Sequence, residues 1–316
     1  MRITIETPSR IHLGIIDLNG NLGRIYGSIG VALERPKTSI TVEKSDRLEI
    51  IGNGNRIEQL LHKISNHFRF KPRVRIELRE SIPEHVGLGS GTQLSLAIGV
   101  AISRIYGIDV GIDELSVILG RGRLSGIGIE AFKNGGFIID AGHEKDNIKG
   151  IPPVILRHDF PEDWSFLIII PEIERGLSGR EEDIAFKRII PSDPEIPARI
   201  CRIIQMKLLP SLMLRDIDNF GEALMEIDMN VGLYFKHIQG GIYKNEFLSE
   251  LIEFSLSNGA KGAGQSSWGP GIYLLIENKN ANKLKKKLIN FLNKKEIAAD
   301  VIKTNANNSG ARIMVD

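Results

Sequence analysis

A glycine-rich segment at residues 87–93 contains the residue types that best suit a chemical role. Glycine alternates there with other residues (GLGSGTQ), and glycine lets backbone amides turn toward a ligand. Two hydroxyl side chains directly precede a helical pattern, whose positive dipole end favours an anion. The segment therefore predicts a phosphate-binding loop, although a tight turn that begins a core helix has the same pattern. The predicted loop residues are Gly87, Leu88, Gly89, Ser90, Gly91, Thr92 and Gln93.

This loop matches neither of the common nucleotide-binding fingerprints. No lysine follows it as in a P-loop, and no dinucleotide-binding pattern precedes it. The 41 Lys and Arg residues nearly balance the 39 Asp and Glu residues, so the chain lacks the basic excess of nucleic-acid binders. The apolar run Leu94–Ile102 is too short to span a bilayer. We therefore expect a local anion site, with neither nucleic acid nor a membrane as a partner.

Periodic apolar residues predict the elements that would position this loop. In the first half, alternation predicts strands at residues 1–7, 38–42, 48–51, 73–78 and 137–140. Helical spacing predicts helices at residues 57–68, 92–106 and 113–119. In the second half, we expect strands at residues 164–170, 259–264, 271–276, 298–303 and 311–315. Helices are expected there at residues 200–214, 220–234, 245–256 and 282–293.

Composition and punctuation predict two folded domains. Hydrophobic residues make up 42% of the chain and charged residues 25%, which excludes wholesale disorder. Prolines in Ile151–Pro161 mark a boundary, so we expect domains at residues 1–160 and 161–316. The second half reads as strand, helices, hairpin, helix and strand, which indicates a split βαβ unit. Cys201 is the single cysteine, which excludes an internal disulfide and fits a cytoplasmic protein.

Three motifs in a fixed order relate these patterns to a known family. PSRIHLG at residues 8–14, the glycine loop and KGAGQSSWGP at residues 261–270 resemble the three motifs of the GHMP kinase superfamily. The resemblance implies an α+β fold with an N-terminal domain like domain 2 of ribosomal protein S5. It also implies a ferredoxin-like C-terminal domain and a phosphate-bearing substrate between the two domains.

The sequence around the three motifs differs from that of the small-molecule kinases in the superfamily and points to a narrower family. The strings PSRIHLGIIDLNGNLGRIYGSIGVAL, GRLSGIGIEAFKNGGFIID and GAGQSSWGPGIY resemble the β-ribofuranosylaminobenzene 5′-phosphate synthases of methanopterin biosynthesis. Those enzymes join phosphoribosyl pyrophosphate (PRPP) to p-aminobenzoate or 4-hydroxybenzoate, with loss of pyrophosphate and carbon dioxide. The resemblance implies a phosphoribosyltransferase. An ATP-dependent small-molecule kinase and a non-catalytic phosphometabolite-binding protein are the alternatives.

The resemblance also implies roles for individual residues. His12, Asp17 and Glu130 are the expected catalytic residues, and the two carboxylates are the expected Mg²⁺ ligands because Mg²⁺ prefers oxygen. Two of them have a structural alternative, namely packing for His12 and a solvated surface for Glu130. The family relationship further suggests a cytoplasmic homodimer. Beyond the glycine loop, the expected substrate- and phosphate-binding residues are Arg24, Ser28, Arg123, Ser125, Gly126, Arg175, Gly264, Gln265, Ser266, Ser267 and Trp268.

Overall fold

Two long antiparallel strands, β1 (Arg2–Asp17) and β2 (Arg24–Lys44), organise the first part of this computed structural model. The structure describes residues 1–173, 193–243, 245–267 and 269–316. The first sheet has the order β12-β1-β2-β4-β3, while β5 and β6 pair with β2, and β7 pairs with β5. Its other strands are β3 (Glu49–Ile51), β4 (Val74–Glu80), β5 (Phe137–Asp140), β6 (His143–Glu144), β7 (Val154–His158) and β12 (Arg312–Val315).

A bulge in β1 near Ser9 changes which residues face each side of the sheet. Before the bulge, Ile5 is buried in a core that also contains residues of helices α1 and α2. Beyond it, Ile11 is buried in a different core, which it shares with the second sheet. Since side chains alternate along a strand, Arg10 and His12 point to the opposite side from Ile11. The bulge therefore turns two polar residues of the first motif toward the helices.

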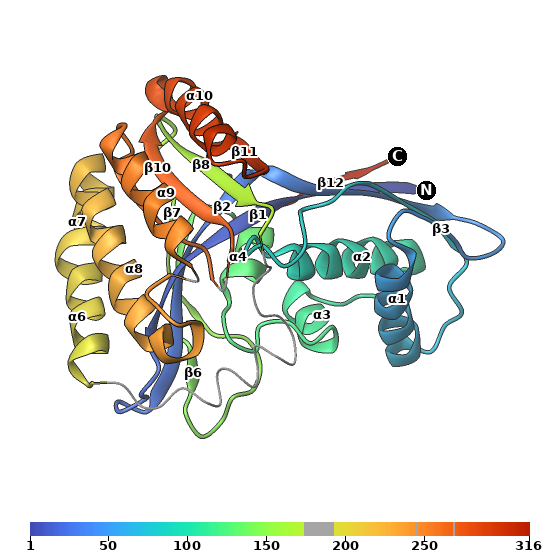
Figure 1. The fold of residues 1–316 in the computed structure, drawn as a ribbon. Coiled ribbons are helices and arrows are strands. Elements are labelled where there is room, and N and C mark those ends of the chain that lie inside the picture. Colours follow the sequence, from blue (N-terminus) through green and yellow to red (C-terminus); the bar gives the residue numbers. More distant parts are fainter. Residues whose placement is uncertain (174–192, 244, 268) are drawn as a thin grey trace.

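Four helices pack on one face of the first sheet (Figure 1). They are α1 (Gly54–Phe68), α2 (Ser90–Tyr106), α3 (Ile112–Ile118) and α4 (Ile127–Lys133). The first three confirm the predicted helices, and α4 is an additional helix that the sequence analysis did not predict. Helix α2 is apolar around most of its surface and ends at Gly107, whose φ of 66° is left-handed. Its N-terminus therefore has a fixed position beneath the sheet.

The second sheet is four-stranded and has the order β11-β8-β10-β9. Numbered from β8 as the first strand of this half, the order is four-one-three-two, which confirms the ferredoxin-like prediction. Its strands are β8 (Trp164–Pro171), β9 (Gly262–Gln265), β10 (Ile272–Glu277) and β11 (Ala299–Thr304). Its helices are α6 (Glu195–Ile203), the π-helical turn η1 (Ile204–Leu208), α7 (Leu209–Leu214), α8 (Ile217–Gln239), α9 (Glu246–Ser257) and α10 (Asn278–Lys294).

The two halves share a hydrophobic core and the last strand. Leu13 of β1, Phe166 of β8 and Phe220 of α8 belong to one buried cluster. The C-terminal strand β12 returns to pair with β1, so the two termini lie close together at one end of these strands (Figure 1). The chain therefore returns from the second sheet to the first through β12, and the division of the chain at residue 160 stays a prediction.

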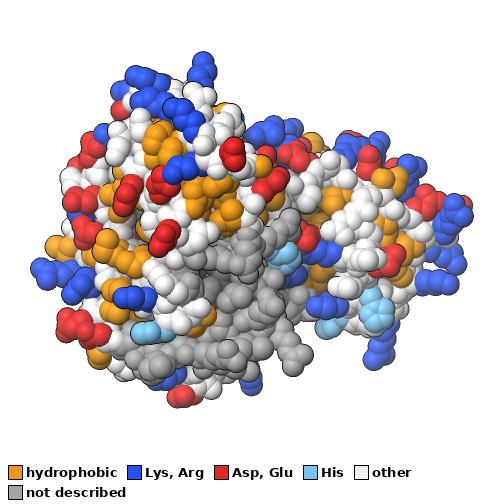
Figure 2. Space-filling view, viewed as in Figure 1, with side chains coloured by type: hydrophobic (Ala, Val, Ile, Leu, Met, Phe, Trp, Pro, Cys, Tyr) orange, Lys and Arg blue, Asp and Glu red, His pale blue; other side chains and the backbone are white. Residues whose placement is uncertain are grey.

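The surface in Figure 2 carries interspersed acidic and basic side chains, as the nearly balanced composition predicts. Within the described part of the chain, no helix has the length and apolar character needed to cross a membrane.

Candidate active site

Ser266 connects three segments that lie far apart in the sequence. Its Oγ accepts a hydrogen bond from the backbone N–H of His12 at 3.0 Å and donates one to the carbonyl of Gly87 at 2.7 Å. Ser266 directly follows β9, Gly87 precedes α2, and His12 lies within β1. The structure thus brings the three sequence motifs together at one side chain, which is 1% exposed.

Gly87 is required at this junction because two loops approach closely. A Cβ atom on Gly87 would lie 2.1 Å from the carbonyl oxygen of Ser266, and its φ of 81° is left-handed. The Gly87 carbonyl also accepts a hydrogen bond from Nη1 of Arg10 at 2.6 Å. Any larger residue would push the glycine loop away from the third motif.

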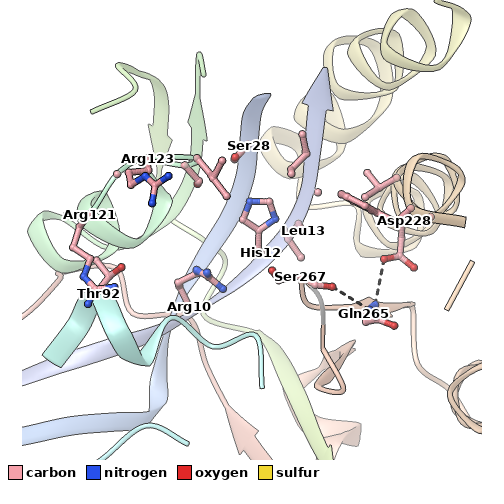
Figure 3. Close-up of a pocket in the computed structure, with 18 of the residues that line it drawn as sticks. Arg10, His12, Leu13, Ser28, Thr92, Arg121, Arg123, Asp228, Gln265 and Ser267 are labelled. Carbon is pink, nitrogen blue, oxygen red and sulfur yellow. Dashed lines mark hydrogen bonds between the residues drawn. The ribbon is translucent and has the colours of Figure 1, made fainter. Parts of the chain in front are cut away.

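A cavity of about 300 Å³ lies beside this junction (Figure 3). Its lining comes from β1, β2, the first turn of α2, the loop before α4, helix α8 and the end of β9. Figure 3 shows Arg121 and Arg123 on one side, Asp228 and Gln265 on the other, and His12 between them. The cavity therefore has a cationic end and an end with a carboxylate, each formed by a different half of the chain.

Three arginines, Arg10, Arg121 and Arg123, line the cationic end. Burial, and secondly the charge of Arg56, lower the pKa of Arg121 to about 10. Its Nε donates a hydrogen bond to Ser95 Oγ at 3.0 Å, which fixes the guanidinium in place. Because this buried guanidinium has lost solvation and lies beside a second positive charge, a bound anion would be favoured here.

The first turn of α2 lies beside Arg121 and beside Arg56 of α1, which is paired with Glu84 and does not line the cavity. A Cβ atom on Gly91 would lie 2.7 Å from Nη2 of Arg56 and 3.1 Å from Nη1 of Arg121. Gly89, with a φ of 78°, is the residue that caps this helix, and Thr92 is the loop residue that lines the cavity. A helix N-terminus beside two guanidinium groups suits a phosphate.

Two buried polar side chains hold the loop that carries Arg121 and Arg123. Asp140 Oδ2 accepts hydrogen bonds from Ser125 Oγ at 3.1 Å and from the Gly126 N–H at 2.9 Å. Burial raises the pKa of Asp140, while these hydrogen bonds act in the opposite direction. His143 Nε2 contacts the Gly122 carbonyl at 3.0 Å from the same side. The predicted pair Ser125 and Gly126 therefore anchors the loop, and Ser125 also lines the cavity.

His12 and Ser28 line the middle of the cavity. Burial, and secondly the charge of Arg10, lower the pKa of His12 to about 3, so its imidazole is neutral at physiological pH. The hydroxyl of Ser28 is buried and has no hydrogen-bond partner among the described residues. Both predicted residues are therefore placed to offer hydrogen bonds to a bound substrate.

Asp228 of α8 lines the opposite end together with Gln265. Its Oδ1 accepts a hydrogen bond from the Gln265 N–H at 3.2 Å. Burial raises the pKa of Asp228 to about 7, and a hydrogen bond from Tyr243 partly offsets this shift. Gly264 allows the close packing here, because a Cβ atom would lie 2.8 Å from Cγ of Asp228. Asp228 was not among the residues predicted from the sequence.

Several predicted residues have local structural partners and are not among the residues that line the cavity. Asp17 Oδ1 accepts hydrogen bonds from the N–H groups of Asn19 and Gly20 and so shapes the turn after β1. Arg24 donates to the carbonyls of Ala141 and Gly142.

Two further predicted residues hold helices together. Gln93 is fully buried, and its Nε2 donates to the Gly128 carbonyl at 2.7 Å, which ties α2 to α4. Glu130 of α4 is 7% exposed, and its Oε1 accepts from Nδ2 of Asn134, the residue that follows the helix, at 2.6 Å.

The predicted Mg²⁺ ligands do not fit a shared metal site. Neither Asp17 nor Glu130 lines the cavity, and each carboxylate already accepts hydrogen bonds. Within the described ranges, no group of three or more His, Cys, Asp or Glu side chains could hold a metal ion. No step is therefore assigned to a metal. The predicted residues Arg175 and Trp268 lie outside the described residues.

Comparisons with known proteins agree with this geometry. Residues 55–133 match the GHMP kinases N terminal domain, and residues 208–294 match the GHMP kinases C terminal domain. The β-ribofuranosylphenol 5′-phosphate synthase of Methanothermobacter thermautotrophicus is 38% identical over 89% of this chain and 91% of its own length. The protein of that name from Archaeoglobus fulgidus is 36% identical over 99% of this chain and 100% of its own length.

A solved structure described as mevalonate kinase has the same fold. It superposes with a TM-score of 0.71 at 17% identity and covers 97% of this chain and 99% of its own. The predicted α+β fold is confirmed by this likeness and by the domain matches. The chain belongs to the GHMP kinase superfamily and, within it, to the family of the β-ribofuranosylphenol 5′-phosphate synthases.

Proposed function

We propose that the protein transfers the ribose 5-phosphate unit of PRPP to 4-hydroxybenzoate in methanopterin biosynthesis. The new bond joins ribose C1 to the ring carbon that bears the carboxylate, and pyrophosphate and carbon dioxide leave. Relatives at 36–38% identity carry the name of the product, a ribofuranosylphenol 5′-phosphate. That name favours 4-hydroxybenzoate over p-aminobenzoate. The structural observation that carries the proposal is the division of the cavity into a cationic end and a carboxylate end.

The cationic end suits a substrate that carries both a phosphate and a pyrophosphate. Arg10, Arg121 and Arg123 supply guanidinium groups, which bind phosphate oxygens in pairs. As ribose C1 separates from pyrophosphate, the leaving group takes the bonding electrons and gains negative charge. Fixed positive groups stabilise that charge without having to reorganise. The site therefore favours departure of pyrophosphate.

The neutral imidazole of His12 and the hydroxyl of Ser28 suit the middle of the substrate. Both lie between the two ends of the cavity, where the ribose and the carboxylate of the acceptor would meet. Because the imidazole is uncharged, it can orient a ribose hydroxyl without adding to the repulsion among the arginines.

The hypothesis that the Glu130 carboxylate stabilises positive charge on the ribose comes from the family resemblance, and it requires this side chain, which does not line the cavity, to act from behind the lining residues. We expect Glu130→Gln to lower the chemical rate by about 10²-fold, or about 2.7 kcal/mol, with a much smaller change in PRPP affinity. The amide still accepts a hydrogen bond from Asn134, so α4 keeps this contact at its end. Single-turnover release of pyrophosphate and equilibrium PRPP binding measure the two effects. Wild-type turnover in the variant would instead assign Glu130 to the packing of α4.

We also propose a Mg²⁺ requirement, a homodimer and a cytoplasmic location. The Mg²⁺ proposal rests on the oxygen-rich substrate, since Mg²⁺ commonly binds substrate phosphates with few protein ligands. The other two rest on the family resemblance and, for the location, on the single cysteine.

The decisive test uses 4-hydroxybenzoate labelled at its carboxyl carbon. The purified protein should release labelled carbon dioxide only when PRPP is also present, and it should release pyrophosphate in equal amount. A parallel reaction with ATP and small alcohols tests the kinase alternative, which predicts ADP and no carbon dioxide. A parallel reaction with labelled p-aminobenzoate tests the choice of acceptor. Absence of PRPP-dependent carbon dioxide release with both acids would refute the proposal.

A further inference from the structure

Asp228 has a position in the cavity that the phosphate-binding chemistry does not use. It lies on α8, across the cavity from Arg121 and Arg123 (Figure 3). Of the described residues that line the cavity, Asp228 alone carries a carboxylate. A carboxylate at this end would repel the phosphates of PRPP, so it must serve the other substrate.

The surroundings of Asp228 suit an aromatic ring with a polar substituent. Val231 and Phe235 follow Asp228 on the cavity-lining side of α8, and Ile242 lines the same region. Apolar walls with a few fixed polar groups are typical of sites that bind and orient a small ring. Gln265 holds Asp228 by its backbone N–H, which points the carboxylate at one place in the cavity.

We propose that Asp228 is the general base that accepts the proton of the acceptor's para-hydroxyl group. This inference rests on the proposed function, because it places the ring of 4-hydroxybenzoate in the apolar half of the cavity. The ring carbon that bears the carboxylate, opposite the hydroxyl, then faces the ribose held at the arginine end.

Each electron pair and proton of this step has a defined destination. As the ribose C1–pyrophosphate bond breaks, the ring carbon opposite the hydroxyl attacks C1, and the hydroxyl proton moves to Asp228. The product of this step is a dienone whose ring is uncharged and which still carries the negative carboxylate. The carbon–carboxylate bond then breaks, carbon dioxide leaves, and its electron pair restores the aromatic ring. The dienone oxygen takes the proton back from Asp228, so no other reactant is required.

The properties of Asp228 match this role. A general base works best when its pKa lies near the operating pH, and burial raises the pKa of Asp228 to about 7. The groups that face it are Tyr243 from the segment after α8, Tyr273 from β10 and the Gln265 N–H. Burial and the charge of Asp228 raise the pKa of both tyrosines, so neither competes for the role of base.

The test compares Asp228→Asn with Glu226→Gln, which removes a carboxylate from the same helix. Glu226 pairs with Lys207 and does not line the cavity, so its variant should keep the wild-type rate. We expect Asp228→Asn to lower turnover of 4-hydroxybenzoate by about 10²-fold or more and to leave PRPP affinity within about threefold. Its remaining rate should rise with pH toward the pKa of a phenol, roughly 10, because the acceptor then ionises without a base.

A measurement on the wild-type protein covers the case in which the variant does not fold. The wild type should use 4-methoxybenzoate at least about 10²-fold more slowly than 4-hydroxybenzoate, since the ether has no proton to give. Full turnover of the ether, a wild-type rate in Asp228→Asn, or a slow variant with an unchanged pH profile would each overturn the inference alone. A wild-type protein that releases no carbon dioxide with PRPP would overturn the proposed function and this inference together.

Discussion

Replacing Ser266 with alanine tests whether one hydroxyl holds the three motifs together. The hydroxyl accepts from the His12 N–H and donates to the Gly87 carbonyl, and both contacts are short. In Ser266→Ala, the Gly87 carbonyl keeps its hydrogen bond from Arg10 Nη1. The His12 N–H loses its acceptor in a region where Ser266 and His12 are at most 9% exposed. The cost of the substitution is therefore set mainly by one unsatisfied backbone donor.

An unsatisfied buried donor costs roughly 1–3 kcal/mol, so we expect the free energy of unfolding to fall by that amount. PRPP binding should weaken by about tenfold, or about 1.4 kcal/mol, because the glycine loop loses a contact that fixes it against β1. Denaturant unfolding and PRPP titration measure the two effects. Ser267→Ala is the matched control, since Ser267 is exposed and its change should stay within about 0.5 kcal/mol of the wild-type stability. The reasoning is refuted if both variants unfold at the same denaturant concentration.

Three other substitutions test the glycine contact, the arginine cluster and the buried carboxylate. Gly87→Ala places a Cβ atom 2.1 Å from a backbone oxygen, whereas Gly150→Ala has a similar φ and open space. Thermal unfolding should show a larger loss for Gly87→Ala, and equal losses would contradict the proposed close approach. Arg121→Ala removes a buried positive charge that lies beside Arg56, so the unfolding temperature of the free protein should not change. The rise in unfolding temperature that PRPP causes should become smaller in this variant. An equal rise in the variant and the wild type would exclude Arg121 from PRPP binding. The pKa of Asp228 is about 7 in the folded protein and about 4 in the unfolded chain. Its contribution to the free energy of unfolding is therefore complete below pH values of about 4 and is lost as the pH rises through about 7. Asp228→Asn should therefore unfold at a higher temperature than the wild type at pH 8 and at nearly the same temperature at pH 4, and the reverse order would contradict the raised pKa.

Most elements of the fold could be predicted because their patterns are local. The strand at Phe137–Asp140 and the helix that ends before Gly107 follow from apolar spacing and from one left-handed glycine. Alternating residues predicted a strand that ends at Thr7, whereas β1 continues to Asp17. A bulge interrupts the alternation there, so two halves of one strand have different inward-facing positions. Helix α4 was missed because glycines surround its seven residues.

The candidate site was only partly predictable because its members meet through long-range contacts. The three motifs and the residues His12, Ser28, Thr92, Arg123 and Gln265 were found from local patterns and the family resemblance. Arg10, Arg121 and Asp228 were missed, since nothing in their neighbours along the chain shows that they share a cavity.

One kind of sequence pattern does indicate two of the missed residues. Asp228 follows Leu224 and Ile227 on the buried side of α8, where an apolar residue is expected at that spacing. Arg10 precedes the buried Ile11 within a strand that is otherwise largely enclosed. A charged residue in an apolar stripe or an enclosed strand is costly to bury, which makes such positions candidates for a site.

The division of charge across the cavity connects the stability of the free protein with its proposed chemistry. The buried guanidinium of Arg121 loses solvation beside the positive charge of Arg56, and the buried carboxylate of Asp228 is favoured only when it is protonated or hydrogen-bonded. The phosphates of PRPP would compensate the buried positive charge at Arg121. The hydroxyl of the acceptor would compensate the buried carboxylate of Asp228 by donating a hydrogen bond to it. Since each substrate compensates a different buried charge, the two ends of the cavity select different molecules. The ribose and the ring carbon that it must reach are thereby brought together in the middle, beside the neutral His12.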